Sequence, residues 1–401
     1  MEDSMVFPRP VAFLVAGATG AATLTAASAP SPLYPVYQRL FGFSAFTLTV
    51  VFAVYVGALL VALLTVGSLS DRIGRRPVAS GAMVLLALGM LLFVVAGGTG
   101  GLVVARVVQG FAVGAATGTV TAMILDAAKD PRRGSIVSSA VPSLGITIGA
   151  VLAGALVEFA PFPRQLVFWV LAAAYLLLAV LVWWVPERSR PAATDQGPLW
   201  RALLPSAALP SVVRPAFLAL VPSIVATWAL SGLSLSLGSS VIGTLLGVHN
   251  HFVVGLVLGA FFVAGTIGGA VSTVLPPSTR QWFGYGTLAG GVVVMLVAVM
   301  ATALPIYVVG SAIAGLGFGS TFQYAVTTLG AAAPQDQRGQ VFATMYIVSY
   351  AAFSVPALAA GLATAAVGLE PTVLAYGAFV VVLVLVAVIA GPRTSRSPAA
   401  R

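Results

Sequence analysis

Residues 67–77 read GSLSDRIGRRP and lie between two long apolar stretches. They form the densest cluster of charge in a chain of which only 7% of the residues are charged. The apolar runs at 46–66 and 78–96 are each long enough to cross a bilayer. The stretch between them therefore predicts a short polar turn that joins two membrane-spanning helices.

Each residue type in this turn has a local role. Gly67 lets a neighbouring helix approach the end of the first apolar run, and Gly74 can take the positive φ of a tight reversal. Pro77 suits the first turn of the next helix. Asp71 is the one acid of the turn. The pattern predicts a tight, strongly basic reversal at the membrane surface.

The ordered spacing of glycine, aspartate and arginine, with Leu69 between, resembles the signature loop of the major facilitator superfamily, which joins the second and third helices. Arginines are common in the cytoplasmic loops of membrane proteins, but that alternative explains the charge and not the spacing. The resemblance implies an all-α fold of twelve transmembrane helices in two pseudo-symmetric six-helix bundles. It also implies that the loop acts as a gating latch through Gly67, Asp71, Arg72, Gly74, Arg75 and Arg76.

The composition indicates a polytopic membrane protein. Of 401 residues, 59% are hydrophobic, far more than a soluble domain carries. A net charge of +9 would suggest a nucleic-acid partner for a soluble chain, but here the charge falls in loops on one side of the membrane, so no nucleic-acid partner is expected. The chain has no cysteine and two histidines, so we expect neither a metal site nor a cofactor.

Twelve apolar runs are long enough to span a membrane. The first follows the acidic residues Glu2 and Asp3, and we interpret it as an uncleaved first helix rather than a signal peptide. The expected spans are 10–32, 45–68, 77–97, 100–126, 136–158, 165–185, 214–240, 250–274, 284–303, 305–331, 340–364 and 371–391.

Twelve spans place both termini on one side of the membrane. With that side assigned to the cytoplasm, all but three of the 19 Lys and Arg residues lie in cytoplasmic loops and tails. The exceptions are Arg39 and Arg164, which fall outside, and Arg106, which lies within a span. The positive-inside rule therefore predicts cytoplasmic termini in a multi-pass protein of the bacterial inner membrane.

A polar, Pro-rich segment between the sixth and seventh runs divides the chain into two similar halves. Gly110 and Gly114 recur 205 residues further on as Gly315 and Gly319, and an Arg-Gly pair at 133 recurs at 338. These matches support a duplicated six-helix unit. The expected organisation is a cytoplasmic N-terminus (1–9), an N-terminal bundle (10–186), a cytoplasmic linker (187–213), a C-terminal bundle (214–391) and a cytoplasmic tail (392–401).

Arg106 is the one charged residue deep within a span. An ionisable group there is costly unless it faces a cavity or a partner. The order Arg106, Gln109, Gly110 resembles the fourth-helix motif of the superfamily, which implies that Arg106 lines the central cavity and handles protons or substrate. The alternative is an arginine that snorkels outward or bonds backbone carbonyls. If Arg106 faces the cavity, Gln109 and Thr117 share its helix face.

Asp126 ends the same span, just before a basic turn. The resemblance implies that an acid at this place pairs with the signature loop, so we expect Asp126 to pair with Arg75 or Arg76. A solvated charge at a helix end is the alternative. The pair, with Asp71 near a helix N-terminus of the other half, would close the cytoplasmic side and release when the halves rock.

No carboxylate lies midway along an expected span. Asp126 and Glu158 lie near opposite membrane surfaces, so either a rim group such as Glu158 carries a proton or transport is not driven by protons. The missing acid also argues against strongly cationic substrates. In the fifth span Ala150, not proline, follows Gly149, and this departure from the superfamily's antiporter signature weakens the expectation of drug/proton exchange.

Uncharged contacts for a substrate can be nominated by helix position. The resemblance implies that the first, fourth, seventh and tenth spans line the cavity. Aromatic rings with scattered hydroxyls suit a bulky amphipathic ligand, although such residues also serve as packing or interfacial residues. The nominated contacts are Thr23, Tyr34, Tyr37, Trp228, Ser231, Gln323 and Tyr324.

The leading hypothesis is a secondary active transporter that exports a small organic compound, a drug or a metabolite, by alternating access, with exchange for protons left open. Uptake of a metabolite by a symporter or uniporter is the rival. A channel or an intramembrane enzyme is the alternative of another class, but the spans hold no clustered nucleophile, base or metal ligands. The expected partners are a small-molecule substrate and the lipid bilayer, and we expect a monomer.

Overall fold

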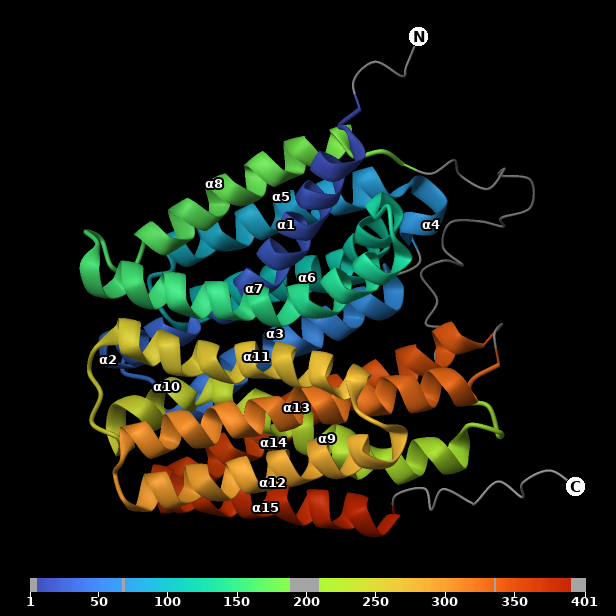
Figure 1. The fold of residues 1–401 in the computed structure, drawn as a ribbon. Helices are drawn as coiled ribbons and strands as arrows, with labels where there is room; N and C mark the ends of the chain where they lie inside the picture. The colour runs from blue at the N-terminus through green and yellow to red at the C-terminus, as the bar shows by residue number, and fades with distance from the viewer. Residues whose placement is uncertain (1–5, 67–68, 188–208, 335–336, 391–401) are drawn as a thin grey trace, which may run out of the picture.

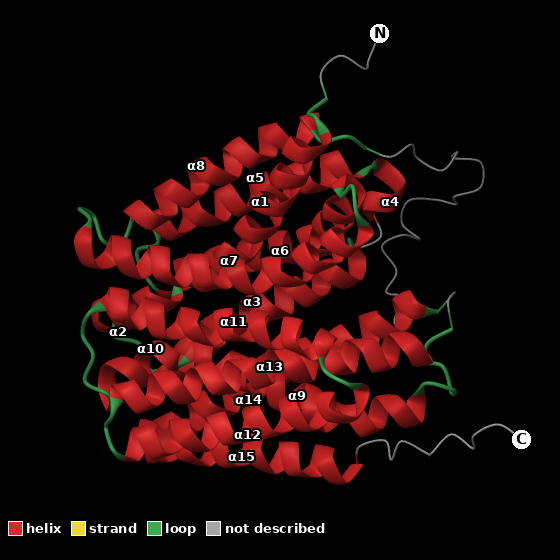
Figure 2. Cartoon of the chain, viewed as in Figure 1, coloured by secondary structure: helices red, strands yellow, loops and turns green. Residues whose placement is uncertain are grey.

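The structure is a computed structural model that describes residues 6–66, 69–187, 209–334 and 337–390. Within these ranges the chain forms helices and loops and no β-strand (Figure 2). Twelve of the described helices are long and apolar enough to cross a membrane. The protein is therefore a multi-pass, all-α membrane protein.

Two groups of helices follow one another along the chain. The first comprises α1 (Arg9–Ser28), η1 (Ser31–Leu33), α2 (Tyr34–Phe41), α3 (Ala45–Thr65), α4 (Leu69–Ile73), α5 (Arg75–Val95), α6 (Thr99–Ala127), α7 (Pro131–Phe159), α8 (Leu166–Leu181) and η2 (Val182–Trp184). The second comprises α9 (Arg214–Ser236), α10 (Gly238–Ser240), η4 (Val241–Leu245), α11 (His251–Val274), α12 (Pro277–Met300), α13 (Leu304–Ala332), α14 (Arg338–Val367) and α15 (Leu369–Ala390).

The two groups form two bundles that lie one above the other in Figure 1, where the first runs from blue to green and the second from yellow-green to red. The bundles meet mainly where α7 packs against α11 and where α3 packs against α14. The short helix α4, which carries part of the signature loop, lies at one end of the first bundle. We call this end of the molecule the signature-loop end.

The first span is longer than its predicted limits of 10–32. Helical structure resumes after α1 in η1 and α2, and the span reaches Phe41. Pro30, Pro32 and Pro35 misled the prediction, because proline interrupts a helix interior but is well tolerated in the first turn of a new helix. Gly42, with a φ of 66°, then ends the extension in the left-handed conformation. This extension carries Tyr34 and Tyr37.

The repeated glycines occupy equivalent packing positions in the two bundles. A Cβ on Gly110 would overlap the backbone carbonyl of Tyr55, and a Cβ on Gly315 would overlap that of Phe261. In each bundle the fourth span therefore packs backbone to backbone against the second span, α6 on α3 and α13 on α11. Small residues allow this close approach in membrane helices.

Close contacts between the bundles gather at the end opposite the signature loop. The Ser31 hydroxyl donates to the Leu235 carbonyl at 3.0 Å, and the Thr147 hydroxyl donates to the Gly259 carbonyl at 3.2 Å. Further contacts join Phe52 with Phe353, Thr49 with Gly361, and Gly154 and Glu158 with His251. Toward α4 the helices of the two bundles diverge (Figure 1).

Candidate functional site

The signature loop folds as a tight helical corner. Helix α4 ends at Ile73, Gly74 follows with a φ of 100°, and α5 begins at Arg75. The positive φ expected of Gly74 is thus confirmed, because an L side chain rarely adopts that backbone conformation. Gly67 and the side chain of Asp71 lie outside the described part of the chain.

Arg75 forms an ion pair with Asp126, one of the two pairings, with Arg75 or Arg76, that the resemblance to the superfamily implies. Its Nη1 also donates to the carbonyl of Ala122 at 3.0 Å, so the guanidinium is anchored on the end of α6. The side chains of Arg75 and Asp126 are 27% and 15% exposed. A pair this well covered is screened less than a surface pair, although burial also adds a desolvation cost.

Glu187 extends this cluster and was not predicted from the sequence. Its carboxylate accepts a hydrogen bond from the backbone N–H of Arg75, at the N-terminus of α5, where negative charge is favourable. The neighbouring Arg76 donates from Nε to the carbonyl of Val185 at 2.7 Å. The cluster therefore joins α5 to α6 and to the end of the sixth span. We call Arg75, Arg76, Asp126 and Glu187 the clasp cluster.

Arg106 is completely buried in the first bundle and is held by polar groups of α1, α2 and α6. Its Nη1 donates to the side-chain oxygen of Gln109 at 2.6 Å and to the carbonyl of Ala27 at 3.3 Å, and its Nη2 donates to the Tyr34 hydroxyl. Gln109 in turn donates to the carbonyl of Ala26 at 2.6 Å. Arg106 therefore does not snorkel outward, and it bonds a backbone carbonyl as the alternative held. With an exposed fraction of 0%, it does not line an open cavity in this structure, contrary to the leading expectation.

Three aromatic rings surround the Arg106 guanidinium. Its central carbon lies 5.2 Å from the ring centre of Tyr55, 5.4 Å from that of Tyr34 and 5.8 Å from that of Phe93. The ring faces are electronegative and attract the cation. Tyr55 and Phe93 were missed in the sequence, because an aromatic residue in an apolar span gives no signal of which way it faces.

The Arg106 charge is only partly compensated. Among the described residues, no carboxylate forms an ion pair with Arg106. Its Nε–H has no hydrogen-bond partner, although the side chain is completely buried. A buried cation held by dipoles and π faces is a high-energy group that an anion would stabilise.

An aromatic cluster in the second bundle lies across the interface from Arg106. Trp228 of α9 contacts four rings on α13 and α14, with centroid separations of 5.1 to 6.4 Å: Phe318, Phe322, Tyr350 and Phe353. Phe353 also contacts Phe52 of α3 at 5.0 Å. Because Phe52 and Tyr55 are one turn apart on α3, this Trp228 cluster continues to the rings around Arg106.

The other nominated contacts do not converge on one point. The hydroxyls of Thr23 and Thr117 donate to carbonyls four residues back in their own helices, and Ser231 is buried on α9. The half-buried Gln323 lies on α13 beside Tyr324, whose hydroxyl lies 3.2 Å from the side-chain oxygen of Gln281. The residues brought together are Arg106, Gln109 and Tyr34 in one bundle and Trp228 in the other.

Tyr37 faces a different space, a pocket of about 430 Å³ at the end opposite the signature loop. Phe93 and Arg164 also line this pocket. The Tyr37 hydroxyl is buried without a hydrogen-bond partner. Since Phe93 also packs on Arg106, one aromatic ring separates this outer pocket from the buried guanidinium.

The family model of the Major Facilitator Superfamily matches residues 16–357. Among solved structures of other proteins, that of a bacterial homologue of the human lysosomal transporter Spinster, in an inward-facing and unoccupied conformation, is similar to this chain. The TM-score is 0.73 at 13% sequence identity, over 95% of this chain and 96% of that one. At a sequence identity this low, the structural similarity supports the fold alone.

Curated relatives match over shorter stretches. A 3-(3-hydroxy-phenyl)propionate transporter of Escherichia coli K12 is 35% identical over 139 residues, 34% of each chain. The multidrug resistance protein MdtL of Escherichia coli O45:K1 is 27% identical over 152 residues, 36% of this chain and 37% of that one. The matched part thus spans about a third of these relatives. With a family model that covers most of its length, the chain belongs to the major facilitator superfamily, whose members are transporters and not enzymes.

Proposed function

We propose that the protein is a secondary active transporter that exports a small amphipathic organic compound with an anionic head group. The observation that carries the proposal is Arg106, a completely buried guanidinium with no described carboxylate partner and an unbonded Nε–H. An anionic substrate supplies the missing negative charge and the missing acceptor. A cationic substrate would meet an uncompensated like charge.

The Trp228 cluster is the second part of the proposed site. Its rings and the Phe52–Phe353 contact offer an apolar surface on the bundle opposite Arg106. The Trp228 Nε1–H is buried without a partner and is a further donor. One relative, the 3-(3-hydroxy-phenyl)propionate transporter, is named for a ligand with a ring and a carboxylate, which supports this chemistry.

Export is the proposed direction, and the similarity to the multidrug resistance protein MdtL supports it. We also propose that the signature-loop end and both termini face the cytoplasm, as the arginine bias predicts. The divergence of the bundles toward α4 then corresponds to an inward-facing state, ready to receive a cytoplasmic substrate (Figure 1). Protons are the candidate exchange ion.

The test uses one phenylpropyl scaffold with three head groups. Inverted membrane vesicles that contain the protein and a pH-sensitive dye are given 3-phenylpropionate, its neutral amide or 3-phenylpropylamine. We expect accumulation of the carboxylate above that in vesicles without the protein, weak accumulation of the amide and none of the amine. Carboxylate-triggered proton movement indicates antiport, and flux without it indicates a uniporter. Preferential accumulation of the amine contradicts the proposal. If vesicles loaded with the carboxylate release it instead, the protein works as an uptake transporter in the cell.

The clasp cluster is proposed to hold one bundle rigid at its cytoplasmic end during rocking. A double-mutant cycle tests its central pair. Arg75→Gln and Asp126→Asn, made singly and together, are expected to show a coupling free energy of unfolding of about 1–2 kcal/mol, within the range found for residues in contact. The matched control is the cycle of Arg214→Gln with Asp126→Asn, which we expect to be additive because Arg214 is an exposed residue at the start of α9 in the second bundle, outside the cluster. If the changes in unfolding free energy in the first cycle are additive, Arg75 and Asp126 do not stabilise the bundle through their pairing.

A further inference from the structure

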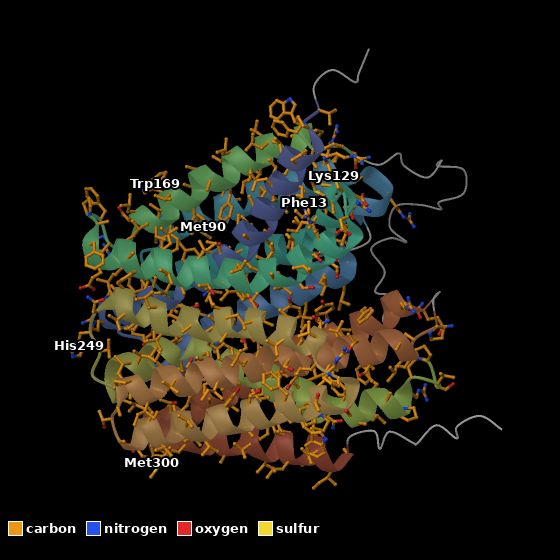
Figure 3. All side chains as sticks on the ribbon, viewed as in Figure 1. Phe13, Met90, Lys129, Trp169, His249 and Met300 are labelled. Carbon is orange, nitrogen blue, oxygen red and sulfur yellow. The ribbon has the colours of Figure 1, made fainter. Side chains whose placement is uncertain are left out.

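A second pocket, of about 260 Å³, lies at the signature-loop end of the first bundle. It is enclosed by the start of α1, the end of α6 and the start of α7. Three cations line it, Arg9, Lys129 and Arg133, together with the ring of Phe13 and small apolar residues at the end of α6. Figure 3 labels Phe13 and Lys129, which lie near one another on this part of the bundle.

The three cations are uncommitted. Each is exposed, and none makes a hydrogen bond or ion pair with a described residue. No acid lines the pocket, and Asp126, three residues before Lys129, pairs with Arg75. Like charges repel one another, so an anion in this pocket would relieve a local cost.

The depth of the pocket matches that of lipid head groups. Arg9 is the first residue of α1, Lys129 follows α6 by two residues, and Arg133 is the third residue of α7. All three therefore lie at one boundary of the spanning helices, outside the hydrocarbon core. Basic pockets between spanning helices at this depth suit phospholipid head groups.

The surrounding helix surfaces indicate that the ligand is a lipid rather than a free anion. Leu14 on α1 is 70% exposed and Ile136 on α7 is 58% exposed, each about one turn from a cation of the pocket. Such exposed apolar side chains offer acyl chains a surface to pack on. Phe13 and the alanines of α6 give the pocket itself an apolar wall.

We propose that this pocket binds the phosphate of an anionic phospholipid, with the acyl chains lying along α1 and α7. The site does not depend on the transported substrate. Lys129 follows Asp126 by three residues, so a lipid bound here also holds the end of α6, which contributes Asp126 to the clasp cluster. The lipid would tie the ends of α1, α6 and α7 together while the second bundle moves.

The experiment counts bound lipids on the purified full-length protein by native mass spectrometry. Dioctanoyl phosphatidylglycerol is compared with dioctanoyl phosphatidylcholine, which has the same chains and no net charge, and with inorganic phosphate. We expect one phosphatidylglycerol bound in preference to phosphatidylcholine, and no competition from phosphate at equal concentration. Equal binding of the two lipids, or full competition by phosphate, overturns the proposal.

Variants assign the lipid to this pocket. Lys129→Gln is expected to weaken phosphatidylglycerol binding about fivefold, because one basic residue near an anionic surface contributes about 1 kcal/mol. Arg9→Gln, Lys129→Gln and Arg133→Gln together should abolish the preference. The matched control neutralises Arg214, Arg280 and Arg338 at the same end of the second bundle and should keep it. An equal loss in both triple variants means non-specific attraction and overturns the proposal.

A thermal measurement separates loss of binding from loss of folding. Bound phosphatidylglycerol should raise the Tm of the wild-type protein and of the control variant, because a ligand that binds the folded state stabilises it. The pocket variant should unfold cooperatively with a Tm that the lipid does not change. If the lipid raised the Tm of the pocket variant as much as that of the wild-type protein, the lipid would bind elsewhere. These readouts remain valid if the proposed substrate class is wrong.

Discussion

Arg106→Gln is expected to reduce accumulation of 3-phenylpropionate in inverted vesicles by on the order of a hundredfold or more. Removing one partner of a buried, hydrogen-bonded charge pair typically costs about 2–5 kcal/mol. Glutamine keeps a polar group near Gln109 and Tyr34 but supplies no positive charge. Arg106→Lys keeps the positive charge but loses the planar guanidinium with its paired N–H donors, so we expect an intermediate transport rate. The measurement is the initial rate per folded protein.

The control for this prediction is Arg164→Gln, which removes an exposed cation from the outer pocket. It should leave the affinity for 3-phenylpropionate within about threefold of the wild-type value, since exposed charges contribute about 0–1 kcal/mol. Size-exclusion chromatography shows whether each variant is folded. If Arg106→Gln transports 3-phenylpropionate at the wild-type rate, Arg106 is a packing residue and the proposed anion site fails.

Gly110→Ala is expected to destabilise the protein by about 1–3 kcal/mol, the usual cost of overpacking a close-packed interior. The added Cβ would overlap the backbone carbonyl of Tyr55, and a backbone atom cannot rotate away. Helix α3 must move off α6, which also withdraws the Tyr55 ring from Arg106. Both thermal stability and transport should therefore fall. Gly315→Ala, at the equivalent position of the second bundle, should lower stability by a similar amount.

Gly57→Ala is the matched control on α3, because a Cβ at that position meets no atom within 4 Å. It should be neutral or slightly stabilising, since alanine favours the helix by about 1 kcal/mol over glycine. The measurement is thermal unfolding of the purified protein in detergent. Equal Tm values for Gly57→Ala and Gly110→Ala would contradict the close packing of α6 on α3.

The spans could be predicted from the sequence because each is a long apolar run that ends at a turn of charged, polar, glycine or proline residues. The predicted limits of the spans are wrong where a helix begins or ends in polar residues. Helix α12 begins at Pro277, seven residues before the predicted limit of 284, because its first turn is polar and hydropathy does not register it. The pairing of Asp126 with Arg75 or Arg76 was expected from the resemblance to the superfamily, and the structure shows the pair with Arg75.

The aromatic half of the candidate site could not be predicted in the same way. Tyr55, Phe93 and Phe353 are three of many aromatic residues in apolar spans, and what brings them together is the rotation of each helix about its axis. That rotation is set by contacts such as Gly110 on Tyr55, which require the partner helix to be known. The role of Glu187 in the clasp cluster was only weakly indicated by the sequence, where it is a single acid directly after Pro186 at the end of a span.

The glycine contacts have a consequence for how the transporter can move. Within each bundle the backbones of α6 and α3, and of α13 and α11, touch at Gly110 and Gly114 and at Gly315 and Gly319, so we expect these helix pairs to move as units. Between the bundles, Gly154 lies against the carbonyl of His251, and Gly255 lies against that of Ala150. The bundles also touch where α3 packs against α14, so we expect them to pivot about both contacts. Added bulk at the α7–α11 crossing should then alter the speed of reorientation more than the strength of substrate binding.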